Sequence, residues 1–330
     1  MTESNILRGG IAGCGYFSQF HLEAWGRMPD VEIVAAADPD LRRAQNAAPR
    51  AYATAEEMFE RESLDFVDIT TRPEWHLPLV DLAARHKVPV ICQKPIAPSW
   101  ESAVQIVEIA ETAGIPCMVH ENWRWQPWYR EAARRIAGGA IGNPVAYQFR
   151  TRQKDGLGDT PYPNQPYFAR MPRLLIYETL IHHIDTARFL FGEVASVLAR
   201  TRRYNPMILG EDQAILTLTH ESGLCGVVDG NRFADPIPAG PAMGDAVFEG
   251  EEAVLTILAT GDIYRNREKV WENTVNTGYR GDSVLATQRH FIDCLRSGGP
   301  FESGGREYLK TVRVVEAAYE SAGIGRAASG

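Results

Sequence analysis

The chain has 330 residues, of which 45% are hydrophobic, and a formal net charge of -8 at pH 7. Two domains are expected at this length, because a single hydrophobic core stops growing at about 250–300 residues. The negative charge argues against a nucleic acid or an anionic membrane surface as the main partner, and a small polar ligand fits better.

Five cysteines are scattered along the sequence without CxxC or another metal-ligand spacing. An odd number of unclustered cysteines is typical of a reducing compartment, and we expect them to be buried thiols. The sequence has no apolar run near the ~20 residues that span a bilayer, and its start, MTESNILRGG, lacks the basic and apolar regions of a signal peptide. These features predict a cytoplasmic protein without a membrane partner.

Residues 1–122 alternate short apolar runs with amphipathic runs. The apolar runs are ILRGGIA, VEIVAAA, DFVDIT, VPVIC and IPCMV. Near-continuous apolar runs of about five to seven residues predict strands buried on both faces, and their alternation with helical segments predicts βαβ units. We therefore expect a doubly wound parallel sheet in this part of the chain.

Residues 123–330 show a different pattern, in which strand-like runs follow one another with little helix between them. Several of these runs, PVAYQFRTR and DQAILTLTH among them, alternate apolar and polar residues. This pattern predicts an open, mostly antiparallel sheet with helices on one face. Two helical runs interrupt it, LLIYETLIHHIDTARFLFG and a C-terminal one at about 306–322. We expect the C-terminal helix to pack back on the first domain.

A glycine-rich segment, GGIAGCGYFSQFH, lies between the first apolar run and a helical run, which is the context of a dinucleotide-binding turn. The best register is Gly13-Cys14-Gly15-Tyr16-Phe17-Ser18, with serine where a third glycine or alanine is usual. Gly13 would make the turn, and Gly15 would let the main chain approach a pyrophosphate. A plain structural turn is the alternative.

Asp38 strengthens the dinucleotide interpretation, because it ends the next apolar run, where an acid can bind the ribose hydroxyls of the adenosine. A carboxylate at this point repels a 2′-phosphate, so NAD is expected rather than NADP. Arg42 and Arg43 follow closely and are the residues that would tolerate a 2′-phosphate instead.

Two segments follow the fourth and fifth expected strands, TTRPEWH (70–76) and CQKPIAP (92–98). With the glycine turn, HLEAW, ENWRWQP and a His-x-x-Asp helix, they make the chain resemble the Gfo/Idh/MocA family of NAD(P)-dependent sugar and polyol oxidoreductases over nearly its whole length. The resemblance implies a Rossmann domain, a C-terminal open antiparallel sheet and a site between the two.

The family's usual Glu-Lys-Pro appears here as Gln93-Lys94-Pro95. The resemblance implies that Lys94 hydrogen-bonds the reacting oxygen and that the Lys94-Pro95 peptide bond is cis. If the two side chains are close, glutamine in place of glutamate removes a carboxylate that would stabilise the ammonium. Adjacent residues of a strand point to opposite faces, which leaves that condition open.

The helix YETLIHHIDTARFL carries an acid, a histidine four residues later and an aspartate three residues after that, namely Glu178, His182 and Asp185. In an α-helix these spacings place all three on one face. The resemblance implies that His182 is the catalytic base, and it puts glutamate where relatives usually have aspartate. His183 is expected to be structural. A metal site built from these residues with His120 and Glu121 is possible in composition, but hydride transfer requires none.

The segment HENWRWQPWYR, at the expected domain junction, mixes aromatic, charged and amide groups, the combination that binds sugars. Hinge packing is the alternative for its aromatic residues, and structural ion pairing is the alternative for Arg173 and Arg232. The expected substrate-binding residues are Lys94, Glu121, Trp123, Arg124, Tyr167, Arg173, Glu178, His182, Asp185, Asn231 and Arg232. The expected cofactor-binding residues are Gly13, Gly15, Tyr16, Phe17, Asp38, Thr70, Thr71, Arg72, Pro73, His76, Gln93, Lys94, Asn122 and Trp123.

The expected activity is NAD-dependent oxidation of a hydroxyl group of a small sugar or polyol, with no metal ion. CQKP and ENWRWQPWYR resemble the branch of the family that acts on small aldoses such as D-apiose. An inositol or sugar-acid dehydrogenase, an oxidoisomerase that retains its NAD, and a non-catalytic dinucleotide-binding sensor are the alternatives. Apolar residues at alternate positions in the strand-rich half predict a homodimer or homotetramer.

Overall fold

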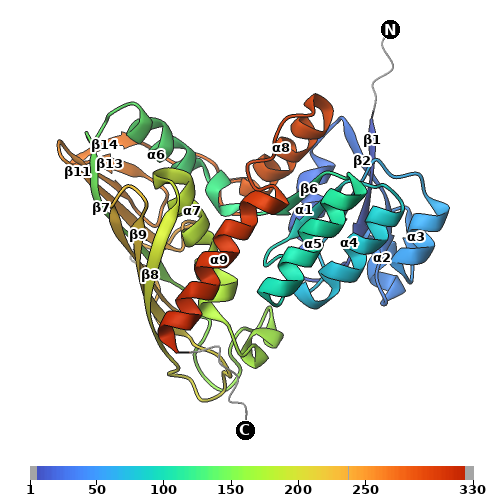
Figure 1. Ribbon diagram of the computed structural model, residues 1–330, viewed down its shortest axis with the longest axis horizontal. Coiled ribbons are helices and arrows are strands. Elements are labelled where there is room, and N and C mark those ends of the chain that lie inside the picture. Colours follow the sequence, from blue (N-terminus) through green and yellow to red (C-terminus); the bar gives the residue numbers. More distant parts are fainter. Residues whose placement is uncertain (1–5, 237, 324–330) are drawn as a thin grey trace. The chain divides into compact units, whose positions relative to one another are not determined.

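The computed structural model describes residues 6–236 and 238–323 (Figure 1). They form two compact units. The first runs through Asn122 and takes in Val284–Lys310, and the second consists of Trp123–Ser283 and the chain from Thr311 onward.

Six parallel strands form the sheet of the first unit, in the order β3-β2-β1-β4-β5-β6. This order follows from two βαβ halves that start next to each other, and it leaves a crevice at the carboxyl ends of the strands where the order reverses. The strands are β1 (Leu7–Ala12), β2 (Val31–Ala37), β3 (Arg50–Tyr52), β4 (Phe66–Ile69), β5 (Val90–Gln93) and β6 (Cys117–His120). All residues of β4 and β5 are buried, as their continuous apolar sequences predict.

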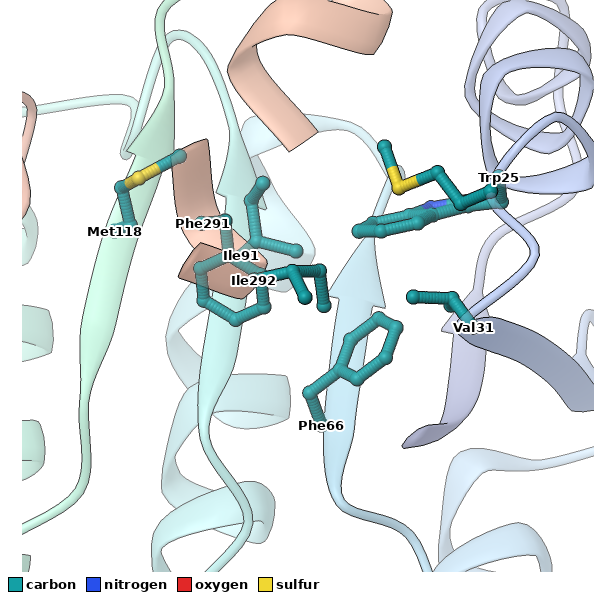
Figure 2. Packing of buried hydrophobic residues seen from close by; sticks show 8 residues of the cluster. Trp25, Val31, Phe66, Ile91, Met118, Phe291 and Ile292 are labelled. Atoms are coloured by element: carbon teal, nitrogen blue, oxygen red, sulfur yellow. The ribbon is translucent and has the colours of Figure 1, made fainter. Parts of the chain in front are cut away.

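Helices connect these strands and cover the sheet. They are α1 (Ser18–Gly26), α2 (Leu41–Ala47), α3 (Ala55–Arg61), η1 (Pro73–Trp75), α4 (His76–Arg85), α5 (Trp100–Ala113) and α8 (Ser283–Ser297). Figure 2 shows Trp25 of α1 and two residues of α8, Phe291 and Ile292, packed with buried residues of the strands. Although α8 comes late in the chain, it completes the core of the first unit.

The second unit is built on an eight-stranded sheet in the order β14-β13-β12-β11-β7-β10-β9-β8. Neighbouring strands are antiparallel except β7 and β10, which are parallel. The strands are β7 (Pro144–Arg152), β8 (Val194–Arg202), β9 (Gln213–His220), β10 (Cys225–Asn231), β11 (Gly244–Gly250), β12 (Val254–Ile257), β13 (Ile263–Arg265) and β14 (Glu268–Trp271).

Helices cover one face of this second sheet. They are η2 (Trp123–Trp125), α6 (Pro127–Ala137), η3 (Pro166–Arg170), η4 (Leu175–Leu180), α7 (Ile181–Phe191) and the part of α9 (Gly305–Ala322) that belongs to this unit. The inward residues Tyr147 and Phe149 of β7 contact the rings of Phe191 and His183 of α7. On the outer face, Leu198 is 70% exposed and Ile215 is 42% exposed.

The expected fold class is therefore confirmed. The expectation that all cysteines are buried is wrong, because Cys225 is exposed on the outer face of the second sheet and only Cys92 is fully buried among the five. Within the described ranges no helix is both long and apolar enough to cross a membrane.

Candidate functional site

The glycine turn joins β1 to α1, and its two motif glycines have different surroundings. Gly13 has a φ of +90°, and a Cβ there would lie 2.6 Å from Thr71 Cγ2 and 2.9 Å from Thr71 N. The fold itself therefore requires glycine at position 13. A Cβ at Gly15 would meet no atom of the described residues within 4 Å. The main chain at Gly15 is thus open to close approach by a ligand.

The helix that follows the turn has no side-chain cap at its start. Phe17, the N-cap of α1, makes no side-chain capping hydrogen bond, and the first turn of α1 carries no acidic residue. Ser18 Oγ donates to the Gly15 carbonyl at 2.7 Å, so the third motif position is buried and hydrogen-bonded. Tyr16 is 43% exposed beside the turn. The N–H groups at a helix start bind anions, so the turn and α1 fit the pyrophosphate of a dinucleotide.

Asp38 lies directly beside the glycine turn. Its Oδ2 accepts a hydrogen bond from Cys14 N at 2.7 Å, and its Oδ1 accepts one from Asp40 N at 2.8 Å. A carboxylate has about four acceptor sites, so capacity remains for ribose hydroxyls. Burial and the neighbouring Asp38 carboxylate raise the pKa of the Cys14 thiol to about 12, so the thiol stays protonated.

The segment after β4 is tied to the turn and to the loop after β5. Thr70 Oγ1 donates to the Gly13 carbonyl at 2.5 Å. His76 is fully buried, and its two ring nitrogens lie 3.0 Å from the carbonyl oxygens of Thr71 and Ile96. Burial lowers the pKa of His76. We expected His76 to contact the cofactor, but in this structure both ring nitrogens face main-chain carbonyls and join two loops. Arg72 is exposed, and Pro73 begins η1.

At the end of β5 the Lys94-Pro95 peptide bond is cis, as expected. Gln93 is buried, and its Oε1 accepts a hydrogen bond from Lys94 N at 2.7 Å. Its Nε2 lies 2.9 Å from His21 Nε2 of α1. Gln93 therefore contacts the main chain of Lys94 as well as a buried histidine.

At the end of β6, Glu121 and Asn122 are both buried. Glu121 Oε2 accepts a hydrogen bond from the hydroxyl of Tyr308, in α9, at 3.0 Å. The carboxylate expected to bind substrate is thus engaged by the last helix of the chain.

In the second unit, His182 lies in the first turn of α7 and stacks on Trp123. Their ring centroids lie 5.0 Å apart at an interplanar angle of 27°, and His182 is 7% exposed. The neighbouring His183 is 2% exposed and its Nε2 lies 2.8 Å from Thr151 Oγ1 of β7, which agrees with the structural role expected for it.

Asp185 is fully buried and paired with Arg124. Arg124 donates through Nε and Nη2 to the two carboxylate oxygens of Asp185, both at 2.7 Å, and Thr311 Oγ1 donates to Oδ1 at 3.0 Å. Both residues were expected to bind substrate. This two-point contact makes them partners of each other, so they fix the segment that carries Trp123 against α7.

Glu178 does not lie in an α-helix. It belongs to the π-helix η4, which ends where α7 begins. The expectation that one α-helix carries Glu178 together with His182 and Asp185 is therefore wrong. A buried carboxylate, Glu211, accepts hydrogen bonds from the main-chain N–H groups of Leu174 and Ile176 and so holds the start of this π-helix. Single π-turns are frequent at functional sites.

The remaining expected substrate contacts have protein partners. Arg232 is buried, pairs with Asp155, and donates to Thr179 Oγ1 at 3.0 Å. Thr179 Oγ1 in turn donates to Glu178 Oε2 at 2.7 Å, so Arg232 and Glu178 belong to one network.

Arg173 donates to Glu316 Oε1 at 2.7 Å and stacks on the ring of Tyr319. The structure thus favours ion pairing for Arg173 and Arg232, the alternative noted from the sequence. Asn231 Oδ1 accepts hydrogen bonds from the next loop, and Tyr167 OH accepts one from Gln165 Nε2 at 3.0 Å.

Comparison with known proteins matches residues 7–121 to the GFO/IDH/MocA oxidoreductase family with its NAD-binding Rossmann fold, and residues 129–241 to the GFO/IDH/MocA C-terminal domain. A D-apiose dehydrogenase from Paraburkholderia graminis is 39% identical, an alignment that covers 98% of this chain and 90% of the relative. The chain belongs to the GFO/IDH/MocA family. A second D-apiose dehydrogenase, from Rhizobium rhizogenes, is 36% identical, covering 99% of this chain and 97% of the relative.

Among solved structures, an Agrobacterium radiobacter oxidoreductase in complex with NAD+, L-tartaric acid and magnesium has a TM-score of 0.87 and 35% identity, covering 97% of each chain. The expectations of an oxidoreductase and of NAD as cofactor are confirmed for this GFO/IDH/MocA protein. Within residues 6–236 and 238–323, no group of three or more histidine, cysteine or acidic side chains is arranged to hold a metal ion.

Reasoning from the sequence missed several buried polar residues of this family member. Asp68, which accepts hydrogen bonds from His21 and Trp25, stands inside a strand that is buried on both faces. An acid in such a strand must have a partner, and that signal was available in DFVDIT. Glu211 carried no comparable signal, because it precedes a strand whose sequence alternates.

Proposed function

We propose that this protein catalyses NAD-dependent oxidation of a hydroxyl group of a small sugar, with D-apiose as the first substrate to test. The observation that carries the proposal is the near-full-length identity, 39% and 36%, to two D-apiose dehydrogenases. Inositol is the second candidate, because an inositol 2-dehydrogenase from Saccharopolyspora erythraea is 29% identical over 68% of this chain.

His182 is the proposed base. Stacking on Trp123 fixes the plane of its imidazole, which is 7% exposed. The neutral imidazole is a general base that can accept the hydroxyl proton. The oxidised nicotinamide, when bound, accepts the hydride.

Lys94 is the proposed partner of His182 on the same oxygen. An ammonium that donates a hydrogen bond to that oxygen stabilises the negative charge that develops as its proton leaves. Glu178 is the third proposed catalytic residue. It lies in the π-turn just before His182 and is linked through Thr179 to Arg232. We propose that Glu178 orients the histidine or holds a neighbouring substrate hydroxyl.

A substrate panel tests the reaction. The purified protein is incubated with NAD and, separately, with D-apiose, myo-inositol and L-tartrate, and the absorbance of reduced nicotinamide is followed. Turnover with D-apiose well above that with the others supports the proposal. Turnover with myo-inositol alone would mean that inositol, and not D-apiose, is the substrate. No turnover with any of the three would contradict the proposal and favour the alternative of a non-catalytic sensor.

Two substitutions test the proposed residues. His182→Ala is expected to lower kcat by ~10²–10⁴ with little change in NAD affinity, and Lys94→Ala by a comparable factor. The double variant is expected to be far less impaired than the product of the two factors, because groups that act as a unit are non-additive. His183→Asn is the matched control and is expected to keep the wild-type pH profile. Near-wild-type turnover by His182→Ala would remove the base from this scheme.

We also infer that copies of the chain associate through the outer face of the second sheet. Support comes from Leu198 and Ile215, which are exposed on the neighbouring strands β8 and β9. Light scattering is expected to give a dimer or tetramer, and Leu198→Asp is expected to shift it toward the monomer. A wild-type monomer at micromolar concentration would contradict this inference. The cytoplasmic location remains a prediction from the sequence.

A further inference from the structure

Three neighbouring strands of the first unit carry a buried polar side chain at their last or next-to-last residue, on one face of the sheet. Alternation puts Asp68 two residues after Phe66 in β4, Gln93 two after Ile91 in β5, and His120 two after Met118 in β6. The three apolar residues belong to the core drawn in Figure 2, where they pack with Trp25. Gln93 and His120 are paired in register, and so are Asp68 and Ile91. Asp68 is therefore level with Ile91 and two residues lower on the sheet than Gln93 and His120, and the three side chains form a buried polar layer that is staggered across the strands, next to the hydrophobic residues.

His21 of α1 lies in the middle of this layer and is fully buried. Its Nδ1 lies 2.7 Å from Asp68 Oδ2, which also accepts a hydrogen bond from Trp25 Nε1 at 2.7 Å. Its Nε2 lies 2.9 Å from Gln93 Nε2, and its ring contacts that of His120, with centroids 4.1 Å apart and the planes tilted by 34°. The titratable groups in contact with this ring are thus Asp68 from β4 and His120 from β6. Gln288 of α8, which is uncharged, donates to the His21 carbonyl at 3.3 Å.

The main chain of Lys94 decides which way the Gln93 amide points. A peptide N–H can only donate, so the atom 2.7 Å from Lys94 N must be the Gln93 oxygen. The Gln93 NH₂ group then faces His21 Nε2, and because it can only donate, His21 Nε2 must accept. The one ring proton of His21 therefore sits on Nδ1 and is donated to the Asp68 carboxylate.

We propose that Gln93 is a positioning residue that orients the peptide of Lys94 and, through the same amide, holds His21 neutral with its proton on Nδ1. The chain of contacts runs from Asp68 through His21 and Gln93 to the peptide N–H of Lys94. An imidazolium at position 21 would donate from both nitrogens, turn the amide over and set its NH₂ group against the N–H of Lys94. The proposal rests on the proposed function at one point only, the catalytic role of Lys94.

A glutamate at position 93 has the same shape but lacks the donor that His21 requires. The folded Gln93→Glu protein must therefore hold one extra proton between the introduced carboxylate and His21, whichever of the two carries it. Above ~6.5 the unfolded chain does not hold that proton. The extra proton therefore stabilises the folded variant at low pH. This stabilisation is lost as pH rises through the pKa that the pair has in the folded protein.

Nitrogen-15 NMR of the wild-type full chain tests the tautomer. The His21 signals are identified as those missing from His21→Asn or, if that variant does not fold, as those that move in Gln93→Leu. The expected result at neutral pH is a protonated Nδ1 and an unprotonated Nε2. An imidazolium, or a proton on Nε2, overturns the proposal.

Thermal unfolding of Gln93→Glu tests the extra proton. Its melting temperature is expected to fall below that of wild type by a further ~3–5 °C per pH unit between about pH 7 and about pH 9. Gln105→Glu makes the same chemical change on the exposed face of α5 and is the matched control, expected to show a constant difference. A Gln93→Glu curve that runs parallel to wild type overturns the proposal.

Turnover tests the effect on Lys94. Gln93→Leu removes both hydrogen bonds and is expected to lower kcat at least ~10-fold. Gln93→Glu is expected to recover most of that loss near pH 6 and to lose it again near pH 9. Wild-type kcat in Gln93→Leu overturns the link to Lys94. If Lys94→Ala itself turns over normally, the proposed function fails, whereas the NMR and unfolding results still decide the protonation of His21.

Discussion

Substituting the two motif glycines one at a time separates the fold from the cofactor site. Gly13→Ala places a methyl group where φ is +90° and where Thr71 Cγ2 would be 2.6 Å and Thr71 N 2.9 Å away. A non-glycine residue in a left-handed conformation costs ~1–2 kcal/mol, and forcing a methyl group against packed backbone costs a further ~1–3 kcal/mol. We therefore expect Gly13→Ala to lose about 3 kcal/mol of stability.

Gly15→Ala adds the same methyl group where no described atom lies within 4 Å. Its free energy of unfolding is expected to stay within ~0.5 kcal/mol of wild type. If the pyrophosphate lies against this main chain, the methyl group clashes with the cofactor and costs about 1–3 kcal/mol of binding, which is ~5–150-fold in Kd.

Calorimetry of the full chain measures both effects. For a unit of this size, 3 kcal/mol corresponds to a fall in melting temperature of about 6–12 °C for Gly13→Ala, against little change for Gly15→Ala. Titration with NAD is expected to show weaker binding by Gly15→Ala. Wild-type NAD affinity in Gly15→Ala would refute the assignment of the turn to the pyrophosphate, and wild-type stability in Gly13→Ala would refute the steric argument.

Three further predictions concern the charged groups of the two units. NAD is expected to bind at least ~10-fold more tightly than NADP, because we expect the Asp38 carboxylate to lie where a 2′-phosphate would bind; equal affinities by calorimetry would mean that the nearby arginines dominate. Burial lowers the pKa of His76, so below ~6.5 the unfolded chain binds a proton that the fold excludes. The stability advantage of wild type over His76→Asn is therefore present above ~6.5 and is expected to shrink as pH falls; a difference that is constant with pH in denaturant titrations would contradict this. Arg124→Met leaves the buried Asp185 carboxylate without its two-point partner and is expected to cost ~3–5 kcal/mol in chemical unfolding, most of it recovered by adding Asp185→Leu. A single variant as stable as wild type would show that Arg188, whose Nη1 lies 4.0 Å from Asp185 Oδ1, is a sufficient cation for this carboxylate.

The local sequence pattern was sufficient to predict the architecture of both units and the cofactor. Continuous apolar runs predicted the buried strands of the first unit, and alternating runs predicted the second sheet, because burial on one or two faces dictates those periods. The position of Gly13, Gly15 and Asp38 after successive strands predicted the dinucleotide turn, because parallel strands bring their carboxyl ends to one edge.

Tertiary structure alone decided what the polar side chains do. Asp185 pairs with Arg124 across 61 residues of sequence, and His21 meets Asp68 across 47 and Gln93 across 72. Glu178 lies in a π-turn that Glu211 holds at its start, where its spacing to His182 had predicted an α-helix. Sequence periodicity determines the face on which a side chain lies, but its partner is set by the order and register of strands and helices that are distant in the chain. For a buried charge or amide, that partner determines whether the group binds a ligand or holds the protein together.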